Sequence, residues 1–276
     1  MAKVPPRVTG AGHGIDGVIR RLRTIAAVLP PADGVAVFNR MYLTVTETVR
    51  ARLGEFADPP AVAELDVLFA GRYLRAVDAV AAGRRPPACW RPLFELRADP
   101  GVHPVQFALA GMNAHIQHDL PLAVVDTCRR LGRSPARLAG DYHRINRLLA
   151  EVETTVREQL LPGPDVLERF EPLTHRIGAW SVDSAREAAW GSVRVLWELR
   201  GRPATAEAFT TALDGAVGLL GRALLLPLGL GVPPAPGHQD VQTADRLPVA
   251  RSRPATVRRG PGGDQAQLEC SGLPSA

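Results

Sequence analysis

Apolar residues recur at intervals of three and four along nearly all of the chain between residues 16 and 230, as they do on one face of an α-helix. In the segment 34–53, for example, one face carries Phe38, Tyr42, Val45 and Val49. Runs of valine and isoleucine are too sparse and irregular to predict strands. The spacing therefore predicts an all-α fold, a single irregular bundle of several helices.

Prolines and glycines divide this pattern into separate helices. We expect helices at residues 15–28, 34–53, 61–82, 105–130, 135–160 and 182–199, with one or two more within 202–228. Ser181 is a suitable cap for the helix that follows it. Residues 83–104 form a long connection punctuated by prolines, which Trp90, Leu93 and Phe94 are expected to anchor to the core.

The two ends of the chain differ in composition from its middle. Residues 1–15 and 231–276 are rich in proline, glycine and arginine and poor in large apolar residues, so we expect both to be disordered. The chain as a whole is 46% hydrophobic, which is enough to bury a sizeable core. The sequence thus predicts one domain at residues 16–230.

The net charge constrains the partners. It is +5, from 33 basic and 28 acidic residues, but residues 16–230 hold only +2 of it and contain no basic run with interleaved aromatic residues. Nucleic-acid-binding surfaces need a concentration of positive charge. We therefore expect no nucleic-acid partner. A small-molecule or anionic substrate is compatible with the sequence. Nothing in the sequence predicts whether the chain forms oligomers.

The cysteines and apolar segments bear on location. Cys89, Cys128 and Cys270 are widely spaced and odd in number, which argues against a disulfide framework and favours a reducing compartment. The first fourteen residues contain no apolar stretch typical of a secretory signal. The apolar run 216–232 is short for a bilayer span and is broken by an arginine and a proline. We expect a cytoplasmic protein with no stable membrane span.

The segment Gly111–Val124, GMNAHIQHDLPLAV, places several polar residues beside an apolar helix face. At 100° per residue, His115 and Asp119 lie one turn apart along the edge of the apolar stripe, whereas His118 points roughly opposite. This phase predicts that His115 and Asp119, rather than His118 and Asp119, reach the interior together.

Three more charged residues interrupt apolar faces: Arg72, Asp141 and Arg186. A lone buried charge is unfavourable, so we expect the two arginines to pair with Asp119 and Asp141, next to His115. The side chains expected to complete the hydrogen bonding are Asn39, Asn113 and Asn146.

Each of these residues also has an alternative role in packing. Asp141 follows a glycine and could cap a helix. Arg72 and Arg186 could carry their charges past the edge of the core. His115 and Asp119 could be an ordinary hydrogen-bonded pair one turn apart.

Two resemblances suggest metal chemistry. His115 and Asp119, followed by Pro121, are similar to a segment of the all-α zinc-dependent phospholipase C and P1 nuclease group. That resemblance implies that both residues bind a divalent metal such as zinc, with water at an open position. The chain lacks that group's N-terminal tryptophan and a clear second ligand pair. His118 with Asp119 also resembles the dipeptide of HD-domain phosphohydrolases.

Six stretches together resemble an uncharacterised bacterial family: FNRMYLTVTETV, LDVLFAGRYLRAVDA, PPACWRPLFE, GMNAHIQHDLPLAV, DYHRINRLLAEV and AREAAWGSVRVLWEL. The family is the domain-of-unknown-function family numbered 5995, common in actinobacteria, and GMNAHI is its most distinctive stretch. The resemblance covers about residues 16–230. It implies one helical domain and a bacterial source, without an established activity.

Two functions therefore remain open. In the first, an interior site serves a hydrolase, in which His115 and Asp119 hold a metal or act as base and orienter. Asp141 joins this catalytic group, while Arg72 and Arg186 bind a phosphate or carboxylate. In the second, the same charges form a closed network that fixes helix register in a non-enzymatic binding or scaffold protein. A pocket with unsatisfied polar groups favours the first function, and a sealed, fully paired network favours the second.

Overall fold

The computed structural model describes residues 14–145 and 181–227, and every regular element within them is helical, which confirms the all-α prediction. The α-helices are α1 (Ile15–Val28), α2 (Gly34–Ala51), α3 (Pro59–Ala81), α4 (Arg91–Leu96), α5 (Pro104–Ala114), α6 (Leu120–Arg130), α10 (Val182–Glu198) and α11 (Pro203–Leu224). Three short 3-10 helices are η1 (Leu53–Glu55), η3 (Pro135–Arg137) and η4 (Leu199–Gly201), and a π-helix is η2 (His115–Asp119).

Several expectations fall outside the described residues. The two ends expected to be disordered, residues 1–15 and 231–276, lie outside the described residues, with the exception of residues 14 and 15. Helix α1 already begins at Ile15. Within the helix expected at 135–160, residues 135–137 form the 3-10 helix η3 and residues 139–145 are α-helical. Residues 146–160, which include Asn146, lie outside the described residues. The limits of the single domain stay a prediction.

Side-chain caps explain why several helices begin where the sequence predicted. Asp33 caps α2, Asp58 caps α3 and Ser181 caps α10, each by accepting a hydrogen bond from a backbone N–H in the first turn. The predicted role of Ser181 is therefore confirmed. The connection at 83–104 contains a helix that the sequence did not predict, α4. Its expected anchors are buried: Trp90, Leu93 and Phe94.

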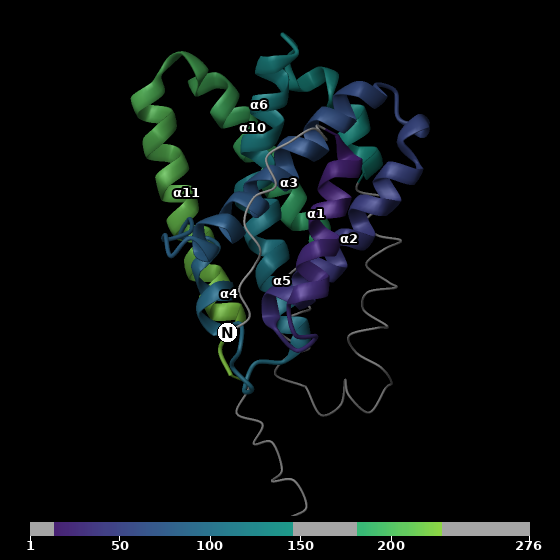
Figure 1. Ribbon diagram of the computed structural model, residues 1–276. Coiled ribbons are helices and arrows are strands. Elements are labelled where there is room, and N and C mark those ends of the chain that lie inside the picture. The colour runs from purple at the N-terminus through teal and green to yellow at the C-terminus, as the bar shows by residue number, and fades with distance from the viewer. Residues whose placement is uncertain (1–13, 146–180, 228–276) are drawn as a thin grey trace, which may run out of the picture. The chain divides into compact units, whose positions relative to one another are not determined.

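Helix α5 occupies a central place among the described helices. It packs against α2 on one side and against α11 on another, as Figure 1 shows. Nearly all of its side chains are buried. The approach to α2 requires a glycine, because a Cβ at Gly111 would overlap the ring of Phe38.

Among the described residues, the core consists of two large apolar clusters and a small one. The first joins α1, α2, α4, α5 and part of α11, with α3 contributing Tyr73 and its neighbours. The second lies between α3, α6 and α10. The small third cluster is formed by Val49, Phe56 and Val62. Partly buried side chains pack between the clusters: Phe69 and Met112 contact both large clusters, and Ile145 contacts the second and the third.

The helix expected at 105–130 is interrupted by η2, so that α5, η2 and α6 follow one another directly. The N–H of Leu120 donates to the carbonyl of His115, five residues back, which is the π-helical pattern. Such local widening of a helix often occurs at functional sites. It falls on the stretch HIQHD, which contains His115, His118 and Asp119.

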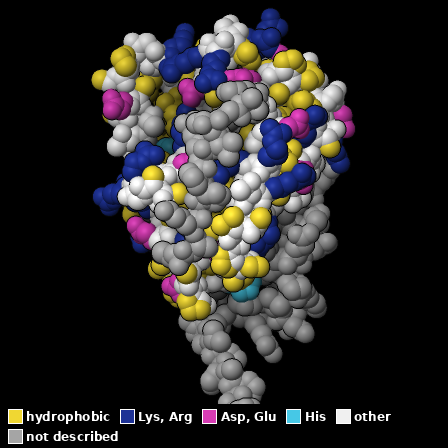
Figure 2. Space-filling view, viewed as in Figure 1, with side chains coloured by type: hydrophobic (Ala, Val, Ile, Leu, Met, Phe, Trp, Pro, Cys, Tyr) yellow, Lys and Arg dark blue, Asp and Glu magenta, His cyan; other side chains and the backbone are white. Residues whose placement is uncertain are grey.

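No helix in the described ranges is long and apolar enough to cross a membrane. On the face shown in Figure 2, arginine side chains form several separate groups with acidic and hydrophobic side chains between them. Exposed ion pairs such as Arg23 with Glu47 and Arg50 with Asp16 neutralise part of the surface charge of the described residues.

Candidate functional site

Asp119 is a buried carboxylate that three side chains contact. Trp90 Nε1 donates to Oδ2 at 3.0 Å, His115 Nδ1 lies 3.1 Å from Oδ2, and His118 Nδ1 lies 2.9 Å from Oδ1. Burial alone would raise the pKa of Asp119, but the hydrogen bonds from the two histidines outweigh burial and hold the pKa at about 2. Asp119 is therefore ionised at neutral pH and accepts hydrogen bonds at both oxygens.

The ionised Asp119 fixes the proton positions of both histidines. Because a carboxylate has no proton to donate, His115 and His118 each donate from Nδ1. A neutral ring then carries its lone pair on Nε2. The two Nε2 atoms reach different surroundings, since His115 lines a cavity beside α2 and α3, whereas His118 Nε2 lies near Asp214 of α11.

The His115 ring is packed among aromatic side chains. It stacks on Phe69 with ring centroids 3.5 Å apart and meets Tyr42 nearly edge-on at 4.5 Å. Burial lowers the pKa of His115 despite the opposing effect of Asp119, so the ring is neutral at pH 7. A neutral imidazole held at Nδ1 by a carboxylate is the arrangement of a general base and its orienting group.

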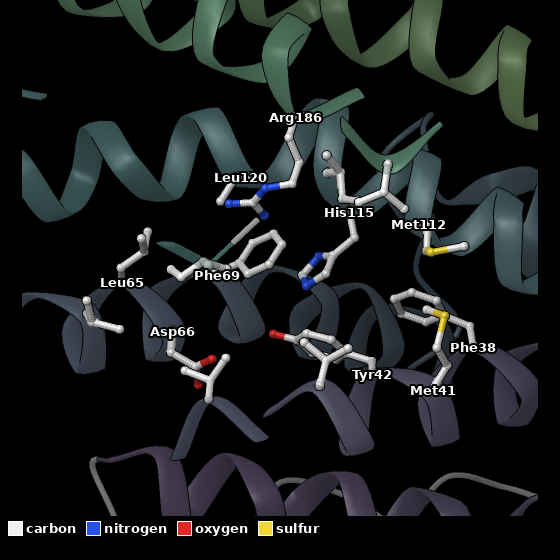
Figure 3. Close-up of a pocket in the computed structure, with 16 residues that line it drawn as sticks. Phe38, Met41, Tyr42, Leu65, Asp66, Phe69, Met112, His115, Leu120 and Arg186 are labelled. Carbon is white, nitrogen blue, oxygen red and sulfur yellow. The ribbon is translucent and has the colours of Figure 1, made fainter. Parts of the chain in front are cut away.

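A cavity of about 100 Å³ lies between α2, α3, η2 and α10, where residues of the three apolar clusters meet. Figure 3 shows it with His115 above Tyr42 and beside Phe69. Its walls are mainly aliphatic and aromatic, and they include Phe38, Met41, Leu65, Phe69 and Leu120.

Polar side chains from three elements reach this apolar cavity. Three buried atoms there, Tyr42 Oη, Asp66 Oδ2 and His115 Nε2, have no hydrogen-bond partner among the described residues. Burial raises the pKa of Asp66 to about 7, so its carboxyl is partly protonated at neutral pH. Burial also raises the pKa of Tyr42 well above its usual value, so its hydroxyl stays protonated. Because buried polar atoms are nearly always hydrogen-bonded, this cavity offers unused hydrogen-bonding capacity to a ligand.

Arg186 enters the same cavity from α10. Its side chain is buried, its guanidinium lies 4.5 Å above the centre of the Tyr142 ring, and Nη2 donates to the Tyr142 carbonyl at 3.3 Å. Burial lowers the pKa of Arg186, but a guanidinium remains charged in proteins. Among the described residues that line the cavity, Arg186 therefore carries the one permanent positive charge.

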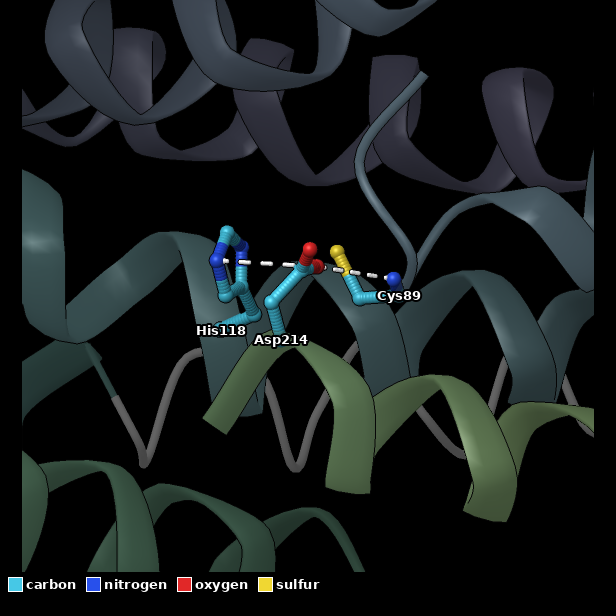
Figure 4. Close-up of side chains that lie close together, drawn as sticks. All are labelled: Cys89, His118 and Asp214. Atoms are coloured by element: carbon cyan, nitrogen blue, oxygen red, sulfur yellow. Dashed lines mark hydrogen bonds and ion pairs between the residues drawn. The ribbon is translucent and has the colours of Figure 1, made fainter. Parts of the chain in front are cut away.

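His118 lies on the side of η2 that faces α11 and the connection before α4 (Figure 4). Its Nε2 is 3.8 Å from Asp214 Oδ1, and Asp214 accepts the backbone N–H groups of Ala88 and Cys89 at 2.8 Å each. Cys89, His118 and Asp214 each offer one possible metal-ligand atom, all within 4.8 Å of one another.

The prediction that His115 but not His118 reaches the interior together with Asp119 is therefore wrong. Helical phase assumes one buried face, but α11 covers the opposite side of η2 as well, so His118 is only 6% exposed. Sequence reasoning also missed Cys89 and Asp214, together with Tyr42 and Asp66 in the cavity. The first two come from distant parts of the chain, and no spacing links them.

The expected pairing of Arg72 with Asp119 or Asp141 is also wrong. Arg72 pairs with Asp126 at 2.6 Å, two turns along the helix from Asp119. Among the described residues, Arg186 contacts Tyr142. Arg72 and Asp141 therefore have partners outside the expected five-residue network, whereas His115 and Asp119 pair with each other within it.

Asp141 has a local role at the start of α3. Its two oxygens accept the backbone N–H groups of Ala57 and Asp58 at 2.8 and 2.9 Å. It thus caps backbone donors just before α3 and does not line the cavity. Its predicted place among catalytic residues gains no support from these contacts.

The two supporting asparagines that the structure describes, Asn39 and Asn113, form hydrogen bonds that join helices. Asn39 donates to the Leu22 carbonyl at 2.9 Å and accepts from the Tyr73 hydroxyl at 3.3 Å. Asn113 donates to the Val217 carbonyl at 2.9 Å and accepts from Gln117 at 2.7 Å. These bonds hold α1 to α2 and α11 to α5.

The predicted metal ligands His115 and Asp119 do not belong to a candidate metal-binding group of three residues in the described part of the chain. The group of three metal-binding side chains found there contains neither residue. Both oxygens of Asp119 accept hydrogen bonds already. The contacts therefore give no support to a metal held by this pair.

Comparison with known proteins identifies the family. Residues 15–227 match the family of unknown function DUF5995, and this range includes the cavity and the Cys89, His118 and Asp214 group. The searches of curated proteins and of solved structures found no match. The resemblance seen in GMNAHI and the other five stretches is therefore confirmed, and the chain belongs to the family of unknown function DUF5995.

Proposed function

We propose that this protein binds a small, mostly apolar molecule that carries a carboxylate or similar anionic group, and that His115 acts on this molecule as a general base. One observation carries the proposal: Tyr42 Oη, Asp66 Oδ2 and His115 Nε2, all buried and without partners among the described residues, converge on one apolar cavity. Ligand sites typically combine apolar walls with a few polar groups that fix orientation.

The cavity limits the size and charge of the ligand. An engineered apolar cavity of roughly 150 Å³ binds benzene, so a volume of about 100 Å³ suits a single ring or a short chain. The buried charge of Arg186 favours a negative group on that ligand. At slightly acid pH, His115 is neutral and Asp66 is largely protonated, so neither adds a full negative charge that would repel an anionic ligand.

Hydrolysis is the reaction for which these groups are best suited. His115 Nε2 takes a proton from a water molecule, and the oxygen of that water attacks a carbonyl carbon of the ligand. Tyr42 and protonated Asp66 donate hydrogen bonds to the developing oxyanion, while Asp119 stabilises the charged imidazole. His115 then returns the proton to the leaving group as the bond to the carbonyl carbon breaks.

The alternative, a scaffold whose buried charges serve packing alone, is favoured by one set of observations. Arg72, Asp141, Asn39 and Asn113 each have partners that join helices. The same explanation does not extend to the cavity, because each unpaired buried polar group costs about 1–3 kcal/mol. Three such groups in one place would destabilise a purely structural core.

Calorimetric titration with benzoate and with benzyl alcohol at pH 6 tests the binding. We expect benzoate to bind and benzyl alcohol to bind at least about tenfold more weakly, because the alcohol lacks the charge that pairs with Arg186. Arg186→Met should weaken the binding of benzoate by a similar factor. Arg194→Met, an exposed arginine of α10, serves as the matched control and should bind as the wild type does. Equal affinity for both compounds, or no binding of either, would exclude the proposed ligand class.

Hydrolysis of acetoxyacetate, a short ester with a carboxylate, tests the chemical role. We expect wild-type protein and Arg194→Met to release acetate from it faster than buffer does, and His115→Gln to return the rate to that of buffer. If His115→Gln hydrolyses the ester as fast as an active wild type, His115 is not the base. If wild-type protein binds benzoate but is no faster than buffer, the cavity is a binding site alone.

A further inference from the structure

We propose that Cys89, His118 and Asp214 form a zinc site on the side of η2 that faces α11. The site shares no residue with the cavity and does not depend on the function proposed for it. Figure 4 shows the three side chains directed toward one another from three elements: the connection before α4, η2 and α11.

The distances between the ligand atoms are close to those of a bound metal. The three candidate atoms lie within 4.8 Å of one another, and His118 Nε2 is 3.8 Å from Asp214 Oδ1. In tetrahedral zinc sites, ligand atoms lie roughly 3.3 to 3.8 Å apart, given bond lengths near 2.0 to 2.3 Å. Closing the difference requires side-chain movements of about 1 Å, with no rearrangement of the helices.

His118 is held in the orientation and tautomer that metal binding requires. Its Nδ1 donates to Asp119 Oδ1 at 2.9 Å, which leaves the Nε2 lone pair toward Cys89 and Asp214. Metal-binding histidines usually donate their other ring N–H to a carboxylate or a carbonyl in this way. Asp119 is itself fixed by Trp90 at 3.0 Å, so the orientation of His118 is rigid.

Asp214 and Cys89 are held against each other by the backbone. Asp214 accepts the N–H groups of Ala88 and Cys89, which fixes its carboxylate beside the thiol. Gly218, one turn further along α11, allows this approach, because a Cβ there would lie 2.6 Å from the Ala88 carbonyl oxygen. The remaining lone pairs of the Asp214 carboxylate stay available to a metal.

The ligand set favours zinc over magnesium or calcium. Sulfur and imidazole nitrogen are ligands of zinc and related transition metals, whereas the hard cations prefer oxygen. Three protein ligands leave a fourth position for water or another group. The Asp214 side chain is 23% exposed, which provides a route from solvent. On binding, the thiol of Cys89 loses its proton to solvent and the thiolate coordinates the metal.

The same three residues raise a competing possibility, a cysteine nucleophile with His118 as its base and Asp119 as the orienting group. Burial argues against it, because Cys89 is 2% exposed and a substrate would need to reach its sulfur. A reactive cysteine is normally a partly exposed thiolate. The two roles differ in their response to an alkylating reagent and to metal.

Reconstitution of chelator-treated full-length protein with Zn²⁺ and, in parallel, with Co²⁺ tests the site. We expect one tightly bound zinc per chain and, with cobalt, the absorption band of a cysteine thiolate bound to the metal. Cys89→Ser should abolish that band and weaken zinc binding at least about tenfold, and His118→Gln should weaken it similarly. Cys128→Ser is the matched control, because Cys128 is also a buried free cysteine, and it should keep both the band and the zinc.

Absence of stoichiometric zinc in the folded wild-type protein would overturn the proposal, as would a thiolate band that survives Cys89→Ser. Fast alkylation of Cys89 by iodoacetamide, unaffected by added zinc, would assign the residue to the nucleophile role instead. Circular dichroism of each variant separates loss of a ligand from loss of the fold. Benzoate binding that persists in Cys89→Ser would show that the zinc site and the cavity are independent.

Discussion

At the scale of single residues, Asp66 has the most unusual environment in the cavity. Its Oδ2 is buried without a partner among the described residues, and its pKa is about 7 because burial disfavours the charged form. In an unfolded chain the pKa is about 3.9. Between these two values the folded protein holds a proton that the unfolded chain has lost. The free energy of unfolding therefore falls as pH rises from about 4 to about 7 and then levels off.

Asp66→Asn should remove this pH dependence. An amide does not ionise, so we expect the variant to match wild type near pH 4 and to be more stable at pH 8, by up to about 4 kcal/mol. Urea unfolding at several pH values measures the difference. The exposed Asp16→Asn change controls for the loss of a carboxylate as such. Parallel pH profiles for wild type and Asp66→Asn would show that Asp66 is not buried as described.

The same carboxyl predicts how ligand binding depends on pH. Ionised Asp66 would repel a bound carboxylate, so benzoate should bind more tightly at pH 6 than at pH 8. In Asp66→Asn the affinities at the two pH values should become nearly equal. Calorimetry at both pH values measures the change, and a stronger affinity at pH 8 would contradict the assignment of Asp66 to the ligand site.

Asp119 connects the two candidate sites through its hydrogen bonds with both histidines. Asp119→Asn should destabilise the protein by about 2–5 kcal/mol, because an amide in this position leaves at least one buried N–H donor unpaired. Urea unfolding at pH 7 measures the loss. Glu47→Gln, in an exposed ion pair with Arg23, should leave stability unchanged. Equal stability of both variants would mean that Asp119 is not the buried acceptor of these hydrogen bonds.

At the scale of elements, the sequence predicts helices well and their interruptions poorly. The starts of α2, α3 and α10 follow from local signals, since Asp33, Asp58 and Ser181 cap their own helices. The π-helix η2 has no such signal, because HIQHD also fits a regular α-helix. Its geometry depends on the helices packed around it, which a single sequence does not reveal.

Helix α11 provides a test of how an element positions the proposed zinc site. Gly218→Ala should move α11 away from Ala88 and Cys89, destabilise the protein by about 1–3 kcal/mol and weaken zinc binding. Gly215→Ala, on the same helix with open space around its Cα, should be neutral or stabilising by up to about 1 kcal/mol. Urea unfolding and zinc titration measure both effects. Identical behaviour of the two variants would mean that α11 does not approach this connection closely.

At the scale of the whole described structure, the central run α5, η2 and α6 has neighbours on several sides. Helices α2 and α3 border the cavity beside η2, and α11 covers the side that carries His118. This arrangement explains which site residues the sequence could identify. His115, Asp119 and Arg186 interrupt apolar stripes and were predicted as interior residues, which they are.

Most of the remaining site residues could not be derived from periodicity. Tyr42 is an ordinary member of an apolar face, and the spacing gives Cys89 no partner. His118 lies opposite the apolar stripe of its own segment and is enclosed because α11, which carries Asp214, packs there. Such contacts between distant segments are not encoded in local spacing.

Asp66 is different, because helical phase does provide a signal for it. It lies four residues after Val62 and three before Phe69, so its carboxyl interrupts the apolar stripe of α3. The sequence prediction did not include this residue.

The central claim is that His115 presents an unprotonated Nε2 to a ligand cavity. The most direct test is ¹⁵N NMR of histidine-labelled protein at pH 7, with the His115 resonances assigned by comparison with His115→Gln. We predict a neutral ring with its proton on Nδ1, and a change in the Nε2 resonance when benzoate is added. A ring with its proton on Nε2, or an Nε2 resonance that does not respond to saturating benzoate, would contradict the account.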